Sequence, residues 1–352
     1  MCARCTLRSM QRRGWTVAVG AVLVAVLTWL VLGIEVPYVA YAPGPTVDTL
    51  RTDTGEAEGD LVVKVEGTKN TTSEGELRLV TVSLIDRPPL IDAVWYWFSD
   101  EYAVVPREFV YPPDKSEEEI QKESKEQFAS SQDSAETAAL RELGCPVSVV
   151  VTGFTDTSPL KDQLKDGDVL RTLDDKPITS VIRLRELLES DSDAERTLTY
   201  QRGDQTESVT IRPDKSKDEL LGLYLKQRQP CKYDVVFDTD VQKIGGPSAG
   251  LMFALSIIDK VKPEDLTGGR VIAGTGEIDD EGRVGPIGGV PQKLIAAKKA
   301  GATVFLTPKA NCDEAVANDP GGLLLVEVST LDDALDALEA LRNDRRPRLC
   351  RA

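Results

Sequence analysis

The hydrophobic and polar positions set an apolar N-terminal stretch apart from the rest of the chain. Residues 16–34 carry no charged side chain, and such a stretch would reach roughly 28 Å as a helix, close to the thickness of a bilayer core. Four arginines and no acid precede it, which favours a cytoplasmic N-terminus. We predict a cytoplasmic tail over 1–14 and a single-pass anchor in the cell membrane over 15–35, with the remaining chain extracytoplasmic. A cleaved signal peptide is the alternative, because residues 40–42 resemble a cleavage site.

The next two segments differ in pattern. Residues 36–113 contain partly alternating, strand-like runs separated by Gly and Pro clusters, which indicates a small β-rich region. Residues 114–143 are highly charged and helical in composition. Ser116 precedes three glutamates, as at a helix start, and Gly144 is suited to a helix end. We interpret this helix as a solvated connector.

Residues 144–215 have the pattern of one compact module. A strand is predicted over 146–151, a tight turn over 164–170, and a β-hairpin around Gly203-Asp204. The module resembles a PDZ domain, on the runs 144–147, 158–160, 164–170 and 175–178. Such domains bind extended peptides by strand addition. Pro146 removes a backbone donor where the family binds a peptide carboxylate, so a purely structural spacer stays open as the alternative.

Residues 232–341 alternate between strands and helices, which predicts an α/β domain with helices packed on a mixed sheet. The expected strands are 233–237, 270–276, 303–306 and 323–326, and the expected helices are 248–261, 290–301 and 330–341.

The amino-acid composition excludes several kinds of active site and partner. The chain of 352 residues has no histidine, which excludes a Ser-His-Asp triad and argues against a His-ligated zinc site. Its formal net charge is −16, and so acidic a body repels nucleic acid, so we expect no nucleic-acid partner. No cofactor and no metal are predicted. Cys2 and Cys5 are interpreted as incidental.

Four cysteines lie beyond the predicted anchor, in a compartment where disulfides form. They are Cys145, Cys231, Cys312 and Cys350. One or two disulfides are expected, and all three pairings stay open.

Ser248 lies in a turn that combines features of a nucleophile site. Gly246, Pro247 and Ala249 surround it, and an apolar helix follows. The glycines permit unusual backbone conformations, and the N–H groups at the helix start could stabilise an oxyanion. The alternative is an ordinary helix N-cap, since serine is favoured there.

Lys293 is the candidate base, because the usual histidine is missing. A lysine accepts a proton only when neutral, so its pKa must fall from about 10.4, and burial has that effect. Apolar residues 294–297 follow Lys293, whereas Lys298 and Lys299 fall on other faces of the helix. A surface lysine without function is the alternative.

Three blocks together resemble the serine–lysine protease domain of Lon. They are the run 246–250, the run Thr275-Gly276-Glu277, and the run from Pro286 to Lys293. The resemblance implies that Ser248 is the nucleophile, that Lys293 is the general base and that Thr275 orients the lysine. Gly245 stands where Lon has an aspartate, so acidic gating is not implied.

The whole chain resembles the bacterial membrane-anchored, PDZ-containing Lon-like proteases. We therefore expect an α+β multidomain fold: an N-terminal transmembrane helix, a small β-rich region, a PDZ-like domain and, over 232–341, a Lon-type α/β proteolytic domain. No ATP-binding G-x-x-x-x-G-K-[ST] motif occurs. The expected function is an ATP-independent serine endopeptidase that cleaves flexible or unfolded extracytoplasmic polypeptides.

The expected partners are polypeptide substrates and a lipid bilayer contacted through residues 16–34, and the resemblance implies a homo-hexamer. The alternative function is a catalytically inactive, membrane-tethered PDZ scaffold that binds exported proteins. A signal-peptidase-like hydrolase fits less well, because Ser248 is far along the chain from the predicted anchor.

Overall fold

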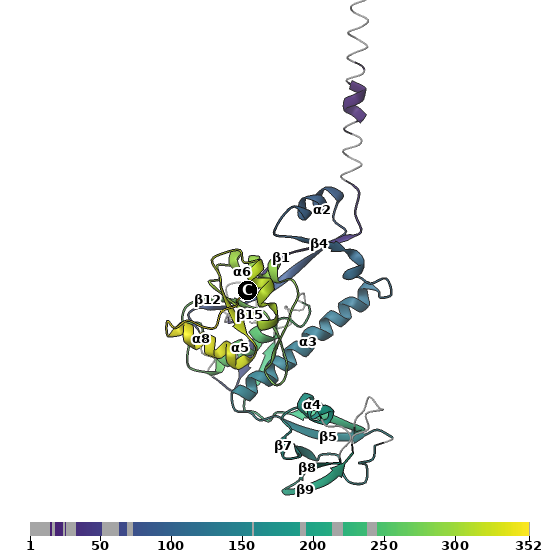
Figure 1. The fold of residues 1–352 in the computed structure, drawn as a ribbon, viewed down its shortest axis with the longest axis vertical. Helices are drawn as coiled ribbons and strands as arrows, with labels where there is room; N and C mark the ends of the chain where they lie inside the picture. Colours follow the sequence, from purple (N-terminus) through teal and green to yellow (C-terminus); the bar gives the residue numbers. More distant parts are fainter. Residues whose placement is uncertain are drawn as a thin grey trace, which may run out of the picture.

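The computed structural model describes residues 15, 18–23, 25, 33–50, 63–68, 73–156, 158–190, 195–212, 221–237 and 245–351. Two sheets organise these residues (Figure 1). Each has six strands; one forms the main body, and the other forms a module that is inserted into the chain after a long helix.

Strands from both ends of the chain build the sheet of the main body. Its order is β16-β15-β12-β3-β1-β4. The strands are β1 (Tyr38–Asp48), β3 (Glu76–Asp86), β4 (Ala103–Pro106), β12 (Val271–Gly274), β15 (Val304–Pro308) and β16 (Leu324–Val328). β12 is parallel to β3 and β15, and β15 is parallel to β16, whereas β1 is antiparallel to β3 and β4. The sheet is therefore mixed.

The predicted fold class is wrong in treating the β-rich region as a separate part. The first half of β3, Glu76–Leu79, pairs with β12. Leu77 and Leu79 of this half are buried in the same core as helix α5 (Gly250–Val261). Backbone pairing and shared apolar burial thus join the two segments into one mixed α/β body. A two-stranded antiparallel sheet of β2 (Val63–Glu66) and β11 (Asp234–Phe237) adds a second link.

Helices pack on this sheet or, in the case of α3 (Glu117–Glu142), on helix α5. Besides α3 and α5 they are α2 (Leu90–Trp97), α6 (Val290–Lys299), α7 (Cys312–Ala317) and α8 (Leu331–Arg342). α5 is buried from Gly250 to Lys260, as its almost continuous apolar sequence requires. α6 packs against β1 and β3, which places it beside the Ser248 turn that precedes α5.

Helix α3 is not the solvated connector that its charge suggested. Its start is as predicted: the Ser116 side chain accepts from the N–H of Glu119, and the Glu119 carboxylate accepts from the N–H of Ser116. Phe128 and Ala135, however, are buried in the core, and the Phe128 ring lies 5.7 Å from that of Phe253 on α5. A stripe of apolar and small side chains lies among the charges and packs on α5.

The inserted module is the segment from residue 148 to residue 228. Its sheet has the order β10-β5-β6-β8-β9, with β7 also paired to β6. The elements are β5 (Ser148–Phe154), β6 (Val169–Leu173), β7 (Lys176–Pro177), α4 (Val181–Ser190), β8 (Arg196–Arg202), β9 (Gln205–Ile211) and β10 (Leu223–Arg228). The predicted hairpin around Gly203 is confirmed, since Arg202 pairs with Gln205. β10 lies beyond the predicted segment 144–215. In Figure 1 the module lies at the lower end of α3.

Two disulfides select one of the three open pairings. Cys145 bonds to Cys231, and Cys312 bonds to Cys350. The first closes the base of the inserted module, and the second ties α7 to the C-terminal segment. Cys2 and Cys5 lie outside the described residues.

The described helices do not include one that has both the length and the apolar character to cross a bilayer. This finding overturns the transmembrane helix in the predicted fold class. The predicted tail, residues 1–14, and much of the predicted anchor, residues 15–35, lie outside the described residues.

Candidate active site

Ser248 lies in a turn, two residues before α5 begins. Gly246 has φ +82°, a left-handed conformation that favours glycine. Ala249 occupies the N-cap position of α5, and no side chain caps this helix end. The Ser248 hydroxyl therefore does not serve as the helix cap that the alternative interpretation proposed. No described residue accepts a hydrogen bond from the N–H of Ser248 or of Ala249, so both can point to a substrate oxygen.

Neighbouring segments hold the turn from two sides. On the α3 side, Gly246 N–H donates to the carbonyl of Ser124 (3.1 Å), and the Ser131 hydroxyl donates to the carbonyl of Pro247 (2.9 Å). On the β12 side, the carbonyl of Ser248 accepts from Gly276 N–H (2.9 Å). These bonds fix the backbone that carries the candidate nucleophile.

Lys293 is buried on α6, as the sequence predicted. Its side chain is 3 % exposed, and Lys298 and Lys299 on the same helix are exposed. Burial lowers the pKa of Lys293 to about 8, while the nearby charge of Glu277 acts in the opposite direction. A substantial fraction of this lysine is thus neutral near pH 8.

Thr275 connects the lysine to the serine turn. Its side chain is fully buried, and Lys293 Nζ lies 3.1 Å from Thr275 Oγ1 and donates to it. The same hydroxyl donates to the carbonyl of Ser248 at 3.0 Å. The predicted contact between threonine and lysine is therefore present. The catalytic roles of Ser248, Lys293 and Thr275 and the oxyanion role of the turn Gly246-Pro247-Ala249 stay predictions.

Ser248 and Lys293 both line one open cleft of about 930 Å³. Its walls come from α3, β3, the Ser248 turn and the segment that leads into α6. Gly289, with φ +71°, is the N-cap residue of α6, and its carbonyl accepts from Lys293 N–H at 3.1 Å. The volume of the cleft lies at the upper end of the range of ligand pockets, roughly 300–1,000 Å³.

Several lining residues were missed by sequence reasoning. Gln121, Ser124 and Lys125 come from α3, and Thr81–Leu84 comes from β3. The small residues of α3 were an available signal, because Ser131 and the alanines 135, 138 and 139 recur at helical spacing. The position of β3 carries no such local signal, since it depends on pairing with β12 far along the chain.

Comparison with known families identifies the C-terminal part. Residues 236–339 match the model described as the Lon protease (S16) C-terminal proteolytic domain. This part of the chain is thus similar to the proteolytic domain of Lon-type serine peptidases.

Sequence comparison with curated proteins also finds Lon proteases. The chain is similar to the Lon protease of Clostridioides difficile (42% identical over 94 residues, 26% of this chain and 12% of the relative). It is also similar to Lon protease 2 of Herpetosiphon aurantiacus (32% over 145 residues, 40% and 18%) and to Lon protease 1 of Bacillus subtilis (34% over 129 residues, 35% and 16%). The chain spans less than a fifth of the length of these relatives.

Among solved structures, the chain is similar to the PDZ domain of the SdrC-like protein from Listeria monocytogenes. That match has a TM-score of 0.20 and 22% identity, and it covers 22% of this chain and 85% of that structure. The second domain of a Listeria protein gives a TM-score of 0.19 at 17% identity, with 26% and 85% covered.

Proposed function

We propose that this protein is a serine endopeptidase that uses Ser248 and Lys293 as a catalytic pair and needs no ATP. The observation that carries the proposal is the burial of Lys293, which lowers its pKa to about 8 in a cleft that it shares with Ser248. An amine that is neutral near physiological pH can accept the serine proton. The sequence contains no ATP-binding P-loop motif, so no ATP-driven unfolding is proposed.

In the proposed mechanism, neutral Lys293 takes the proton of Ser248 while the serine oxygen attacks a peptide carbonyl. The N–H groups of Ser248 and Ala249 stabilise the oxyanion that forms. The protonated lysine then gives its proton to the leaving amine, and an acyl-enzyme results. Water, deprotonated by the same lysine, attacks the ester and regenerates the serine. Thr275 keeps Lys293 oriented through the bond to its hydroxyl.

The substrate class follows from the edge of β3. Residues Val82–Leu84 pair with β1 on one side, whereas β12 pairs only with Glu76–Leu79 on the other. No described strand therefore pairs with Val82–Leu84 on the side away from β1. These residues line the cleft, and an extended polypeptide can add there as a strand. We propose flexible or unfolded segments as substrates, since such a segment can become extended and pair its backbone groups with this edge.

The two disulfides support a location outside the cytoplasm. Disulfides persist in oxidising compartments and are rare in reducing ones. We propose that the inserted module, with a PDZ-like role in substrate binding or regulation, and the proteolytic domain both act there. A homo-hexamer belongs to the same proposal, by resemblance to Lon, and sedimentation of the purified full chain would test it.

The direct test is cleavage of casein and of a fluorogenic peptide by the full chain. Ser248→Ala and Lys293→Ala are each expected to lower kcat by on the order of 10⁴-fold or more, because residues that act as a unit lose most of their effect together. Lys298→Ala is the matched control on the same helix. Full activity of the Lys293→Ala protein would disprove the catalytic pair.

A second readout separates the enzyme from the inactive scaffold that the sequence left open. A serine-reactive fluorophosphonate is expected to label Ser248 in the wild-type chain and not in Ser248→Ala. Labelling depends on the base, so Lys293→Ala should also lose it. A wild-type chain that binds exported peptides but neither cleaves nor is labelled would favour the scaffold.

A further inference from the structure

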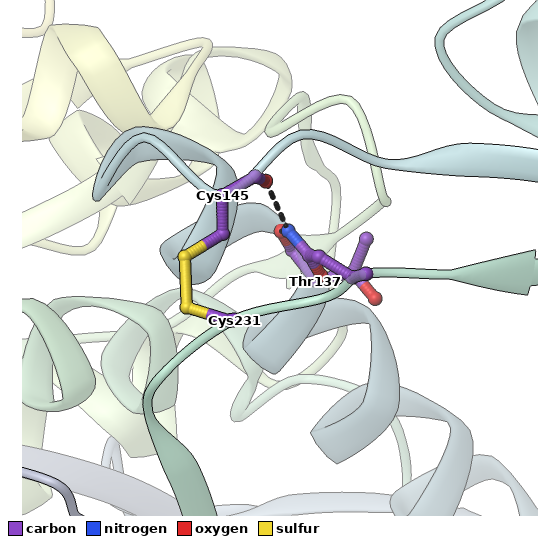
Figure 2. Close-up of a disulfide and its surroundings, with 4 residues drawn as sticks. Thr137, Cys145 and Cys231 are labelled. Carbon is purple, nitrogen blue, oxygen red and sulfur yellow. Dashed lines mark hydrogen bonds between the residues drawn. A yellow bond between two sulfur atoms is a disulfide. The ribbon is translucent and has the colours of Figure 1, made fainter. Parts of the chain in front are cut away.

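The inserted module is fastened to the main body at its base. Cys145 lies just before β5 and Cys231 just after β10, and the disulfide between them closes this base (Figure 2). Gln229 Nε2 also donates to the carbonyls of Thr137 on α3 (3.1 Å) and of Cys145 (2.9 Å). The segment that enters the module and the segment that leaves it are therefore both attached near the C-terminal end of α3. This attachment restricts rotation of the module relative to α3.

A second attachment joins the module to a hairpin of the proteolytic domain. The hairpin consists of β13 (Glu277–Ile278), a turn, and β14 (Val284–Gly285). Thr179 Oγ1 donates to a carboxylate oxygen of Glu281 at 2.9 Å, and Gln227 Nε2 donates to Asp280. A third contact, an ion pair, joins the hairpin to α4 of the module.

That ion pair is Arg283 with Glu186, and Arg283 also bonds Asp279 within the turn at 2.7 Å. Arg141, near the end of α3, completes the junction. Its guanidinium donates to Glu281 at 2.8 Å and to the carbonyl of Thr179 at 3.0 Å. The junction thus contains a branched network of partly buried charges, in which hydrogen bonds are stronger than on an open surface.

The other end of the same hairpin holds the candidate active site. Gly276, the residue before β13, donates to the carbonyl of Ser248, and its own carbonyl accepts from Leu251 N–H (3.1 Å). Glu277, the first residue of β13, lines the cleft with Ser248 and Lys293. The segment from the module contacts to the Ser248 turn is therefore only a few residues long.

The main body holds the opposite side of the hairpin. Val284 N–H donates to the carbonyl of Ser329, and Leu331 N–H donates to the carbonyl of Gly282, both at 2.8 Å. The turn is thus hydrogen-bonded to the start of α8 and the residues just before it on one side, and to the inserted module on the other. The contacts of the inserted module come from a part of the chain that carries no candidate catalytic residue.

We infer that the inserted module positions the active site: Thr179, Glu186 and Gln227 hold the β13–β14 hairpin, and the hairpin in turn holds the Ser248 turn. The three are positioning residues, because they act through the hairpin and do not touch the cleft. The inference rests on the proposed peptidase function. It assigns the module a role in the chemical step, apart from any capture of substrate.

The test removes the module's contacts and leaves the hairpin sequence intact. The variant Thr179→Val, Glu186→Gln, Gln227→Leu is compared with the control Arg185→Gln, Lys226→Gln, whose exposed side chains lie on the same α4 and β10. The full chain is assayed with a short fluorogenic peptide and with casein. We expect kcat to fall about tenfold for both substrates at unchanged KM, since small misplacements of reacting groups have large effects on rate.

A role in substrate capture alone would instead raise KM for casein and leave peptide hydrolysis unchanged, and this result would overturn the inference. Hydrogen exchange supplies a readout that does not need activity. Amides of residues 275–285 are expected to exchange faster in the triple variant than in the control, with α5 unaffected. Equal exchange and equal kcat would also overturn it.

The outcomes separate the inference from the function on which it rests. If the wild-type chain neither cleaves nor is labelled at Ser248, the proposed function fails, and exchange over residues 275–285 still decides the coupling. If the triple variant does not fold, the single variants Thr179→Val and Gln227→Leu carry the same measurements, with smaller expected effects in the same direction.

Discussion

The amine of Lys293 lies 3.1 Å from the hydroxyl oxygen of Thr275 and donates a hydrogen bond to it. The threonine in turn donates to the carbonyl of Ser248. A single buried hydroxyl is therefore hydrogen-bonded both to the candidate base and to the backbone of the candidate nucleophile. The Thr275 side chain is fully buried, and the carbonyl of Ser248 accepts a second hydrogen bond from Gly276 N–H.

Replacing Thr275 should show how much the rate depends on the orientation of Lys293, because Lys293 itself stays in place as the base. Thr275→Val keeps the shape but removes one acceptor and one donor in a buried position, which costs about 1–3 kcal/mol of folding stability. We expect kcat to fall by roughly 10–100-fold with little change in KM, because the reacting groups lose their alignment. Thr275→Ser retains the hydroxyl and should restore most of the activity. Equal kcat for Val and wild type would contradict the orienting role.

The pKa of Lys293 predicts how the rate depends on pH. Because the base must be neutral, kcat/KM should rise with pH and level off above about pH 8, the pKa to which burial lowers this lysine. The measurement is the pH–rate profile of peptide hydrolysis by the full chain. A profile that is flat between pH 6 and 10 would contradict a lysine base.

The same lysine makes a prediction about stability. Its pKa is about 8 when folded and about 10.4 when unfolded. The unfolded chain therefore holds one more proton between these values, and stability rises with pH across this window. The cost of burying the charge is fully present below pH 8. Relative to Lys293→Met, which has no charge to bury, wild type should gain about 2–3 kcal/mol from pH 8 to 10.5 in urea unfolding.

The candidate nucleophile and base could be predicted from the sequence because their signals are local. The glycines and Pro247 around Ser248 restrict a turn, and the apolar neighbours of Lys293 indicate which face of α6 is buried. Both signals lie within a few residues of the group that they describe. The strands and helices of residues 232–341 were predicted from the same kind of pattern, and the structure contains them with small shifts in their bounds.

What the sequence did not reveal depends on contacts between distant segments. β3 joins β12 through a register that no local pattern encodes. α3 contains so many charged residues that its narrow stripe of apolar and small side chains around Ala135, which packs on α5, was not recognised in the sequence. The hairpin contacts of Thr179 and Gln227 are polar, and single polar residues carry no periodic signal. The transmembrane helix was predicted from apolar length alone, and no described helix meets that requirement.

A prediction about Ser131 tests whether α3 supports the Ser248 turn or is only a connector. The buried Ser131 hydroxyl donates to the carbonyl of Pro247. Ser131→Ala removes this bond at little change in volume, so we expect a loss of about 1 kcal/mol in stability and a several-fold lower kcat. Ser130→Ala, at the neighbouring exposed position, is the control. If α3 were only a connector, the two variants would behave alike.

Replacing Glu277 tests what sets the pKa of Lys293, because the charge of Glu277 raises this pKa and burial lowers it. Burial lowers the pKa of the lysine to about 8, and the Glu277 carboxylate raises it. Glu277→Gln removes the charge and keeps the side-chain size, so the pKa of Lys293 should fall further. The midpoint of the pH–rate profile is then expected to move to lower pH, and the rate near pH 7 should increase relative to the plateau. Glu314→Gln, on α7, is a control of equal charge change. A midpoint that stays in place or rises in Glu277→Gln would show that another group titrates in the profile.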